Sequence, residues 1–152
     1  MGARRAQIGQ CRGMNDIQVT EVDERDSSWE DDSPRFRVYL HSTNGTDTRG
    51  STATFDITGA DVLQVIDWAQ RQAGSRLTYA VALVADFEPG GRPGRGLTWL
   101  VGMDGNDTPH SPLEEDRQAR MLTRRRDPVG VPVADRAPDD LPRWGGWDSG
   151  LR

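Results

Sequence analysis

Cysteine and histidine are scarce in this chain, with one and two residues respectively. The single cysteine, Cys11, cannot form an internal disulfide, and no Cys and His residues stand at metal-binding spacing. The two histidines, His41 and His110, accompany no Gly-x-Ser-x-Gly motif, and we expect both at the surface. The sequence therefore predicts no catalytic residue, no metal and no cofactor, and a reducing, cytoplasmic setting.

Long apolar runs are missing as well. No segment approaches the roughly 20 apolar residues that cross a bilayer, and the arginines near the N-terminus precede no apolar stretch typical of a signal peptide. Hydrophobic residues make up 34% of the 152 residues, and the mean hydropathy is -0.73. We therefore expect no membrane association, and a packed core that includes only part of the chain.

Lysine is absent, so all 19 basic residues are arginine, and they are outnumbered by 24 acidic residues. The net charge of -5 argues against nucleic acid as the partner. The excess acid lies in residues 1 to 34, which we interpret as a flexible acidic arm around Trp29. Within this arm, residues 17 to 22 alternate between apolar and polar, and they could add a strand to the edge of a sheet.

The most strongly patterned stretch predicts a helix over residues 58 to 74. Thr58 is expected to cap its first turn, with Asp61 returning the bond, and Gly74 is expected to end it. A helical wheel separates a polar arc from one broad apolar arc, which we expect to be buried. The apolar arc contains Val62, Leu63, Val65, Ile66, Ala69 and Ala73.

Alternating residues predict two strands on each side of this helix. The first two cover residues 35 to 41 and 51 to 58, and an Asn-Gly pair between them is typical of a hairpin. The second two cover residues 76 to 87 and 96 to 103, with a turn rich in Pro and Gly between them. The residues expected on the apolar faces are Phe36, Val38, Leu40, Ala53, Phe55, Ile57, Leu77, Tyr79, Val81, Leu83, Leu97, Trp99, Val101 and Met103.

The order ββαββ, together with the right-handed crossover rule, predicts a two-layer α/β (α+β) sandwich. Its four-stranded, mainly antiparallel sheet would have the spatial order 2-1-3-4, with the helix across one face. Residues 35 to 106 would form this core domain, which is close to the lower size at which such domains fold alone.

Residues 107 to 152 are expected to lie outside the core. After a turn at 104 to 107, Ser111 and Glu114 form a capping box around Pro112, which begins a helix to about residue 125. The apolar residues of this helix share no face, so we expect it to be solvated or bound to a partner. An extended tail rich in Pro, Gly and Asp follows and contains Trp144 and Trp147.

Two apolar surfaces have no partner within the predicted fold. Trp68 falls on the polar arc of the first helix, between Gln64 and Gln72. Either the arm or the tail folds back over these surfaces, or they bind a protein partner or a second copy of the chain. The second surface is the back of the sheet, with Tyr39, Ala80, Ala82, Val84 and Leu100.

A basic stripe lies on one side of the second helix, where Arg117, Arg120 and Arg124 follow each other at helical spacing. Such a stripe could contact phosphates. However, three acidic residues precede it in the same helix, and they favour a solvated face or contact with the acidic arm.

These features predict a small, non-enzymatic protein-interaction module that binds a protein partner or its own copy through the sheet back and the Trp68 face. The alternative is an acidic inhibitor of the immunity or antitoxin kind, in which residues 21 to 32 occupy a basic nucleic-acid-binding site on the target. A third hypothesis is an uncharacterised enzyme, or a contact with nucleic acid through the basic stripe.

Overall fold

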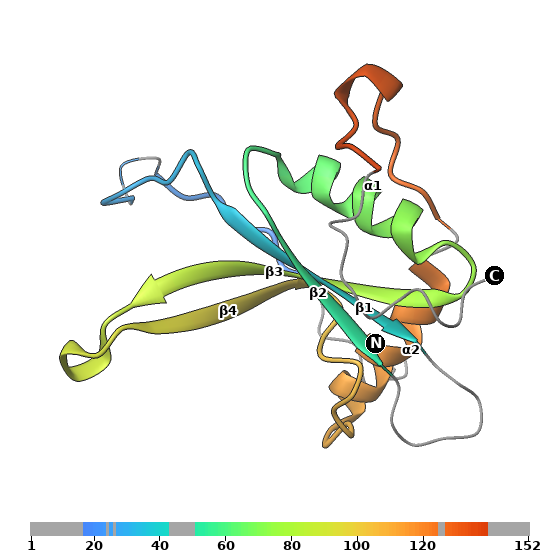
Figure 1. Ribbon diagram of the computed structural model, residues 1–152. Helices are drawn as coiled ribbons and strands as arrows, with labels where there is room; N and C mark the ends of the chain where they lie inside the picture. The colour runs from blue at the N-terminus through green and yellow to red at the C-terminus, as the bar shows by residue number, and fades with distance from the viewer. Residues whose placement is uncertain (1–16, 24, 26, 43–50, 125–126, 140–152) are drawn as a thin grey trace, which may run out of the picture.

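The computed structural model describes residues 17–23, 25, 27–42, 51–124 and 127–139 of the chain. Its sheet has the order β2-β1-β3-β4, and every neighbouring pair is antiparallel (Figure 1). The predicted fold class and strand order are therefore confirmed. The elements are β1 (Arg35–Ser42), β2 (Thr52–Ile57), α1 (Val62–Ala73), β3 (Leu77–Phe87), β4 (Gly94–Val101) and α2 (Pro112–Arg124), with short 3-10 turns at Pro89–Gly91 and Val133–Asp135.

The main core lies between α1 and one face of the sheet. Alternation along β1 turns Phe36, Val38 and Leu40 toward the helix, as predicted, and all three are buried. Tyr79 and Val81 of β3 lie on the same face, as does Val65 of α1. The connection between β1 and β2, with its predicted Asn-Gly turn, lies outside the described residues, as do residues 1 to 16.

The β3–β4 hairpin is longer than its neighbours and projects from the sheet (Figure 1). Strand β1 pairs with β3 only as far as the Arg35–Val84 match, whereas β3 and β4 remain paired out to Phe87 and Gly94. The predicted turn is confirmed, with Gly90 and Gly91 at positive φ. The ring of Phe87 packs so closely over Gly94 that a Cβ there would lie 3.2 Å from it.

Helix α1 begins later than predicted, and its buried side is rotated from the predicted arc toward Trp68 and Gln70. Asp61, not Thr58, is the N-cap, and it exchanges two hydrogen bonds with Gln64 in a capping box. The helix contacts the sheet along Val65, Ala69 and Ala73. Leu63 lies about 200° around the helix from Val65 and is 53% exposed, so its predicted burial is wrong.

Strand β4 does not keep one set of side chains on one face. Its register with β3 shifts between the Ala82–Trp99 and Val81–Val101 pairs, which leaves Leu100 as an extra residue in a β-bulge. Val101 therefore packs on the main core, whereas Trp99 packs on the back of the sheet. The prediction that Trp99 and Val101 share a face is wrong because the bulge reverses the alternation.

Helix α2 is largely solvated, as predicted, but one of its residues packs on the sheet. Met121 is buried against Ala80 and Met103 on the back of the sheet, so a second layer covers part of the surface predicted to be bare. Gly102 permits this approach, because a Cβ there would lie 3.1 Å from Met121 and 3.2 Å from Ala80. In Figure 1, α1 lies above the sheet and α2 lies below it.

None of the described helices is long and apolar enough to cross a membrane.

Trp68, which was predicted to face outward, is only 5% exposed. It lies about 60° around the helix from Val65, so its ring extends from the edge of the buried stripe and meets Phe55 edge-on at 5.5 Å. Its outer side is covered by residues 127 to 139, which run along α1. The prediction of an outward Trp68 failed because these residues pack on the polar arc of the helix.

We expect Trp68→Ala to lower the free energy of unfolding by about 3 to 5 kcal/mol, because it removes a large buried ring. Leu63→Ala, at an exposed position of the same helix, should cost less than about 1 kcal/mol. Chemical denaturation of the two variants measures both values. Equal losses would contradict the orientation of α1, and Trp68→Phe, which keeps most of the packing, provides a milder comparison if Trp68→Ala does not fold.

Candidate functional site

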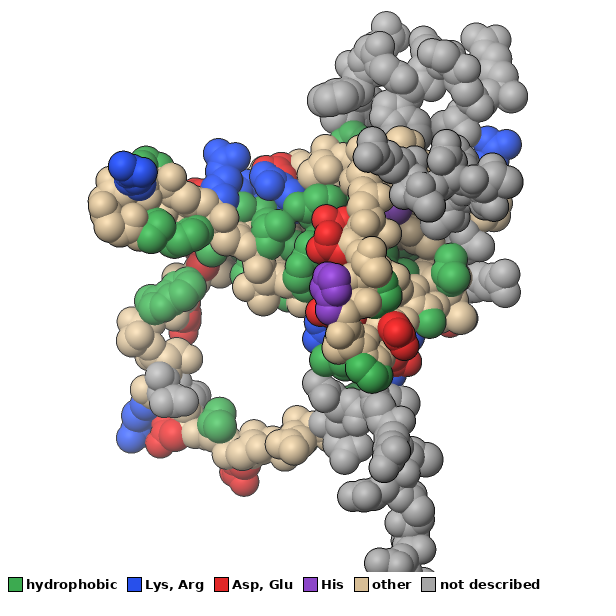
Figure 2. Space-filling model, turned by 90° about the horizontal axis from the view of Figure 1, so that it is seen from below, with side chains coloured by type: hydrophobic (Ala, Val, Ile, Leu, Met, Phe, Trp, Pro, Cys, Tyr) green, Lys and Arg blue, Asp and Glu red, His purple; other side chains and the backbone are tan. Residues whose placement is uncertain are grey.

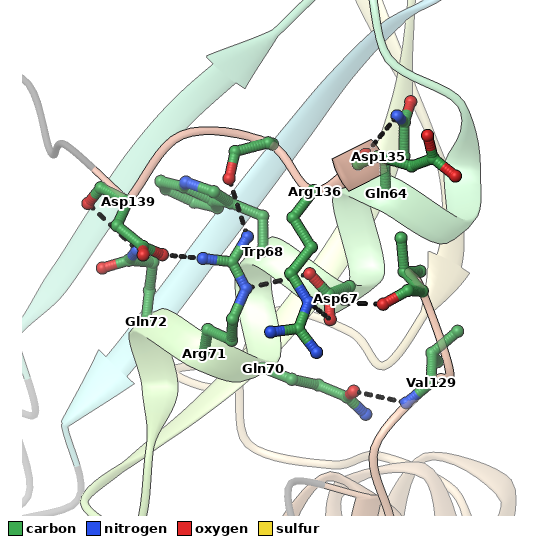
Figure 3. A network of polar contacts seen from close by, with 12 residues as sticks. Gln64, Asp67, Trp68, Gln70, Arg71, Gln72, Val129, Asp135, Arg136 and Asp139 are labelled. Carbon is green, nitrogen blue, oxygen red and sulfur yellow. Dashed lines mark hydrogen bonds and ion pairs between the residues drawn. The ribbon is translucent and has the colours of Figure 1, made fainter. Parts of the chain in front are cut away.

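Residues 127 to 139, here called the strap, occupy the side of α1 that was predicted to bind a partner (Figure 3). The indole Nε1 of Trp68 donates a hydrogen bond of 2.8 Å to the carbonyl of Pro138. Gln64 donates to the carbonyl of Asp135, and Gln72 donates to the carbonyl of Asp139 at 3.3 Å. The chain itself therefore binds all three predicted partner residues of this face.

Ionic contacts hold the middle of the strap. The carboxylate of Asp67 is almost completely buried, and Arg71 donates to it at 2.9 Å. Arg136 of the strap approaches the other carboxylate oxygen at 3.7 Å. Arg71 also donates to the carbonyl of Ala137 at 2.8 Å and pairs with Asp139. A buried carboxylate requires such partners, so the strap supplies part of the environment that allows Asp67 to be buried.

The buried amide of Gln70 joins four elements. Its Nε2 lies 3.1 Å from the hydroxyl of Tyr79 on β3 and 3.1 Å from the carbonyl of Arg124 at the end of α2. The same nitrogen lies 2.9 Å from the carbonyl of Asp127, and its Oε1 accepts from the backbone N–H of Val129 at 2.9 Å. One side chain therefore connects α1, β3, α2 and the strap.

Sequence reasoning missed this network because a polar arc on a helix usually faces water. The sequence feature that indicated the network was Trp68, a large apolar residue among polar ones. Cover of Trp68 by the arm or tail was one of the two predicted alternatives, and binding of a partner was the other. The predicted cover by Trp144 or Trp147 concerns residues outside the described part of the chain.

We expect Gln70→Leu to destabilise the protein by about 2 to 4 kcal/mol, because it removes the partner of the buried Tyr79 hydroxyl and the hydrogen bonds to half-buried backbone groups of α2 and the strap. Gln72→Leu, one turn away from Trp68 with a single exposed hydrogen bond, should change stability by about 0.5 kcal/mol or less. Thermal and chemical unfolding compare the two variants. Similar small effects would mean that the strap contributes little to folding.

His41 is 2% exposed, so its predicted position at the surface is wrong. The backbone N–H of Gly105 donates to its Nε2 at 3.3 Å, which leaves Nδ1 as the protonated nitrogen that donates to Thr52 Oγ1 at 3.0 Å. A Cβ at Gly105 would lie 2.9 Å from the imidazole ring. The histidine thus fixes the 104 to 107 turn to the sheet through a contact that glycine permits.

Burial lowers the pKa of His41 below its ordinary value of 6.5, and the charge of Asp104 opposes this only in part. The unfolded chain therefore binds a proton at His41 more readily than the folded chain does. The stabilisation from neutral His41 is fully present above pH 6.5 and is lost as the pH falls from 6.5 toward the lowered pKa.

We therefore expect His41→Gln to remove part of the loss of stability that the wild type shows on acidification below pH 6.5. His110→Gln, at an exposed histidine, is the matched control substitution. Denaturation midpoints measured across this pH range test the difference. Parallel curves for wild type and His41→Gln would show that His41 is not the titrating group.

A groove between β4 and α2, here called the β4–α2 groove, brings several of the predicted interaction residues together. It encloses about 220 Å³ and combines a row of helical residues with the bulged end of β4. All three arginines of the basic stripe line it, as does Leu100, which is 42% exposed. Its lining consists of Trp99, Leu100, Gly102, Leu113, Asp116, Arg117, Arg120, Met121 and Arg124.

The other predicted residues of the sheet back lie around this groove or apart from it. Tyr39 packs against Trp99, with ring centroids 5.1 Å apart, and so supports the groove from beneath. Val84 is buried where the hairpin leaves the sheet and does not line the groove. In the view from below (Figure 2), hydrophobic and basic side chains lie next to each other where the hairpin projects.

The arginines of the molecule differ in how they are neutralised. Arg37 forms a two-pronged ion pair with Asp56 at 2.6 and 2.9 Å, which raises the pKa of Arg37 and lowers the pKa of Asp56. In the groove, Arg120 pairs with Asp116 at 2.8 Å. Arg117 and Arg124 have no ion pair within the described residues, so the groove carries a net positive charge in an acidic protein.

Within the described part of the chain, no three His, Cys, Asp or Glu residues form a group that could hold a metal ion. Comparisons with protein-family models, with curated proteins and with solved structures found no match to this chain.

Proposed function

We propose that this protein is a non-enzymatic interaction module whose β4–α2 groove binds an acidic protein segment that also carries apolar side chains. The observation that supports this most strongly is that arginines and apolar residues line the same groove. Arginine binds carboxylates through two parallel hydrogen bonds, and Trp, Met and Arg are enriched in protein interfaces. The predicted partner face around Trp68 is left out of the proposal because the strap occupies it.

The size of the groove favours the side chains of a peptide over a separate small molecule. Pockets that enclose drug-sized ligands usually measure about 300 to 1,000 Å³, whereas this groove measures about 220 Å³. Trp99 and Leu100 would contact an apolar anchor of the partner, and Arg117 and Arg124 would pair with carboxylates beside that anchor. Such a central apolar contact with charges around it is a common arrangement in interfaces.

A protein partner fits the electrostatics better than a nucleic acid does. The chain has a net charge of -5, and the neighbouring Arg35 and Arg37 are already paired with Asp86 and Asp56. Nucleic-acid surfaces usually combine many unpaired basic residues over a larger area. The basic stripe is therefore proposed to bind carboxylates.

The alternative of an acidic inhibitor remains the second candidate function, and the exposure of the arm supports it. The described residues of the arm that precede Ser33 are all exposed, including Trp29. An acidic segment with free apolar side chains could bind a basic site on a target protein.

The proposed function is tested with a fluorescent peptide in which Trp and Leu stand among Asp and Glu, by anisotropy titration of the full-length protein. We expect binding that weakens with salt, and a loss of about tenfold or more, roughly 1.4 kcal/mol, in Arg117→Glu. Arg92→Glu, at the exposed hairpin tip, is the matched charge reversal and should bind as the wild type does.

Two further probes distinguish the classes of partner. A peptide with Lys in place of Asp and Glu should not bind, and neither should single-stranded oligodeoxythymidine. Binding of the oligonucleotide without binding of the acidic peptide would overturn the proposal in favour of nucleic acid. Equal affinities of Arg117→Glu and Arg92→Glu would place the binding site elsewhere.

A further inference from the structure

We infer that the acidic arm of a second copy of this chain, residues 17 to 32, is a ligand of the β4–α2 groove. This inference rests on the proposed function and names one partner of the same site. The arm of each copy binds in the groove of the other copy, so that two copies associate by exchanging arms.

The arm has the chemistry that the groove requires. Residues 17 to 32 contain seven acidic residues and one arginine, and apolar side chains stand among the acids. Ile17 and Val19 are each 94% exposed, Val22 is 71% exposed and Trp29 is 78% exposed. Four exposed apolar side chains in one acidic segment are costly to leave in water, and they match the Trp99 and Leu100 side of the groove.

The structure also indicates why the ligand comes from a second copy. In Figure 1 the arm runs to the left from the start of β1 and then turns back toward the middle of the picture, whereas α2 lies to the lower right. Among the described residues, Arg117 and Arg124 have no ion pair with the arm of their own chain. The backbone N–H of Ser33 bonds to Asp31 at 2.9 Å, so the arm turns just before it enters β1. The described residues of the arm are all exposed, so another molecule can reach them.

Arm exchange produces a closed assembly. Each copy has one arm and one groove, so a two-fold dimer contains the same contact twice and leaves neither unsatisfied. Once the first arm is bound, the second arm lies close to the second groove, so its effective concentration there is high. Weak individual contacts can therefore give a stable dimer, and salt should weaken it because both contacts are ionic.

Sedimentation velocity of full-length variants tests this exchange. Variant A carries Val19→Ser, Val22→Ser and Trp29→Ser, which remove apolar contacts of the arm. Variant B carries Arg117→Glu and Arg124→Glu in the groove. We expect the wild type to dimerise, with dimerisation weakened about tenfold or more in each variant alone. A mixture of A and B should form a heterodimer that is weaker than the wild-type dimer but tighter than either variant alone, because it keeps one intact contact, between the groove of A and the arm of B.

Val133→Ser replaces an exposed apolar residue of the strap and should dimerise as the wild type does. Circular dichroism confirms that each variant is folded, and Arg117→Ser with Arg124→Ser replaces variant B if charge reversal unfolds it. A monomeric wild type at all concentrations would overturn the inference, as would a mixture of A and B that associates no more tightly than A or B alone while the wild type dimerises.

The inference and the proposed function fail in different ways. If variant A binds the fluorescent acidic peptide while the wild type stays monomeric, the groove binds acidic segments of other proteins and the arm exchange is wrong. If variant A does not bind the peptide and the wild type does not dimerise, both are wrong.

Discussion

The buried amide of Gln70 is the contact on which the outer half of the molecule depends. Its two N–H groups are shared among the last carbonyl of α2, a carbonyl of the strap and the hydroxyl of Tyr79, and its oxygen accepts from a backbone N–H of the strap. Because buried polar groups without partners are costly, these four elements have to meet at one place. The position of α2, and with it the β4–α2 groove, is therefore linked to the packing of the strap on α1.

The two faces of the sheet are completed in different ways. On the α1 side, the strap supplies carbonyls to Trp68 and Arg71, and Arg136 adds a second cation to Asp67. On the other side, α2 contacts the sheet mainly through Met121 and leaves Arg117 and Arg124 free of ion pairs within the described residues. Among the described residues, the second face retains the β4–α2 groove, which is the surface that we propose for a partner.

Two local backbone features shape that surface. The bulge in β4 turns Trp99 to the back of the sheet and leaves Leu100 partly exposed at the groove. Gly102, with φ of 71°, lets Met121 approach Ala80, which sets the helix beside the bulge. The groove is consequently formed by residues that lie close in sequence on β4 and are opposed by one face of α2.

The sequence alone determined the strands, both helices, the sheet order and the basic stripe, because these depend on periodicity, capping residues and crossover handedness. It did not determine that His41 and Trp68 are buried, that Leu63 is exposed, or that β4 contains a bulge. Those outcomes depend on which segments pack on each other. The polar arc of a helix has the same residue pattern whether it is solvated or covered by another segment of the chain. Only the tertiary structure decided this, since the hydrogen bonds of Gln70 join residues more than fifty positions apart.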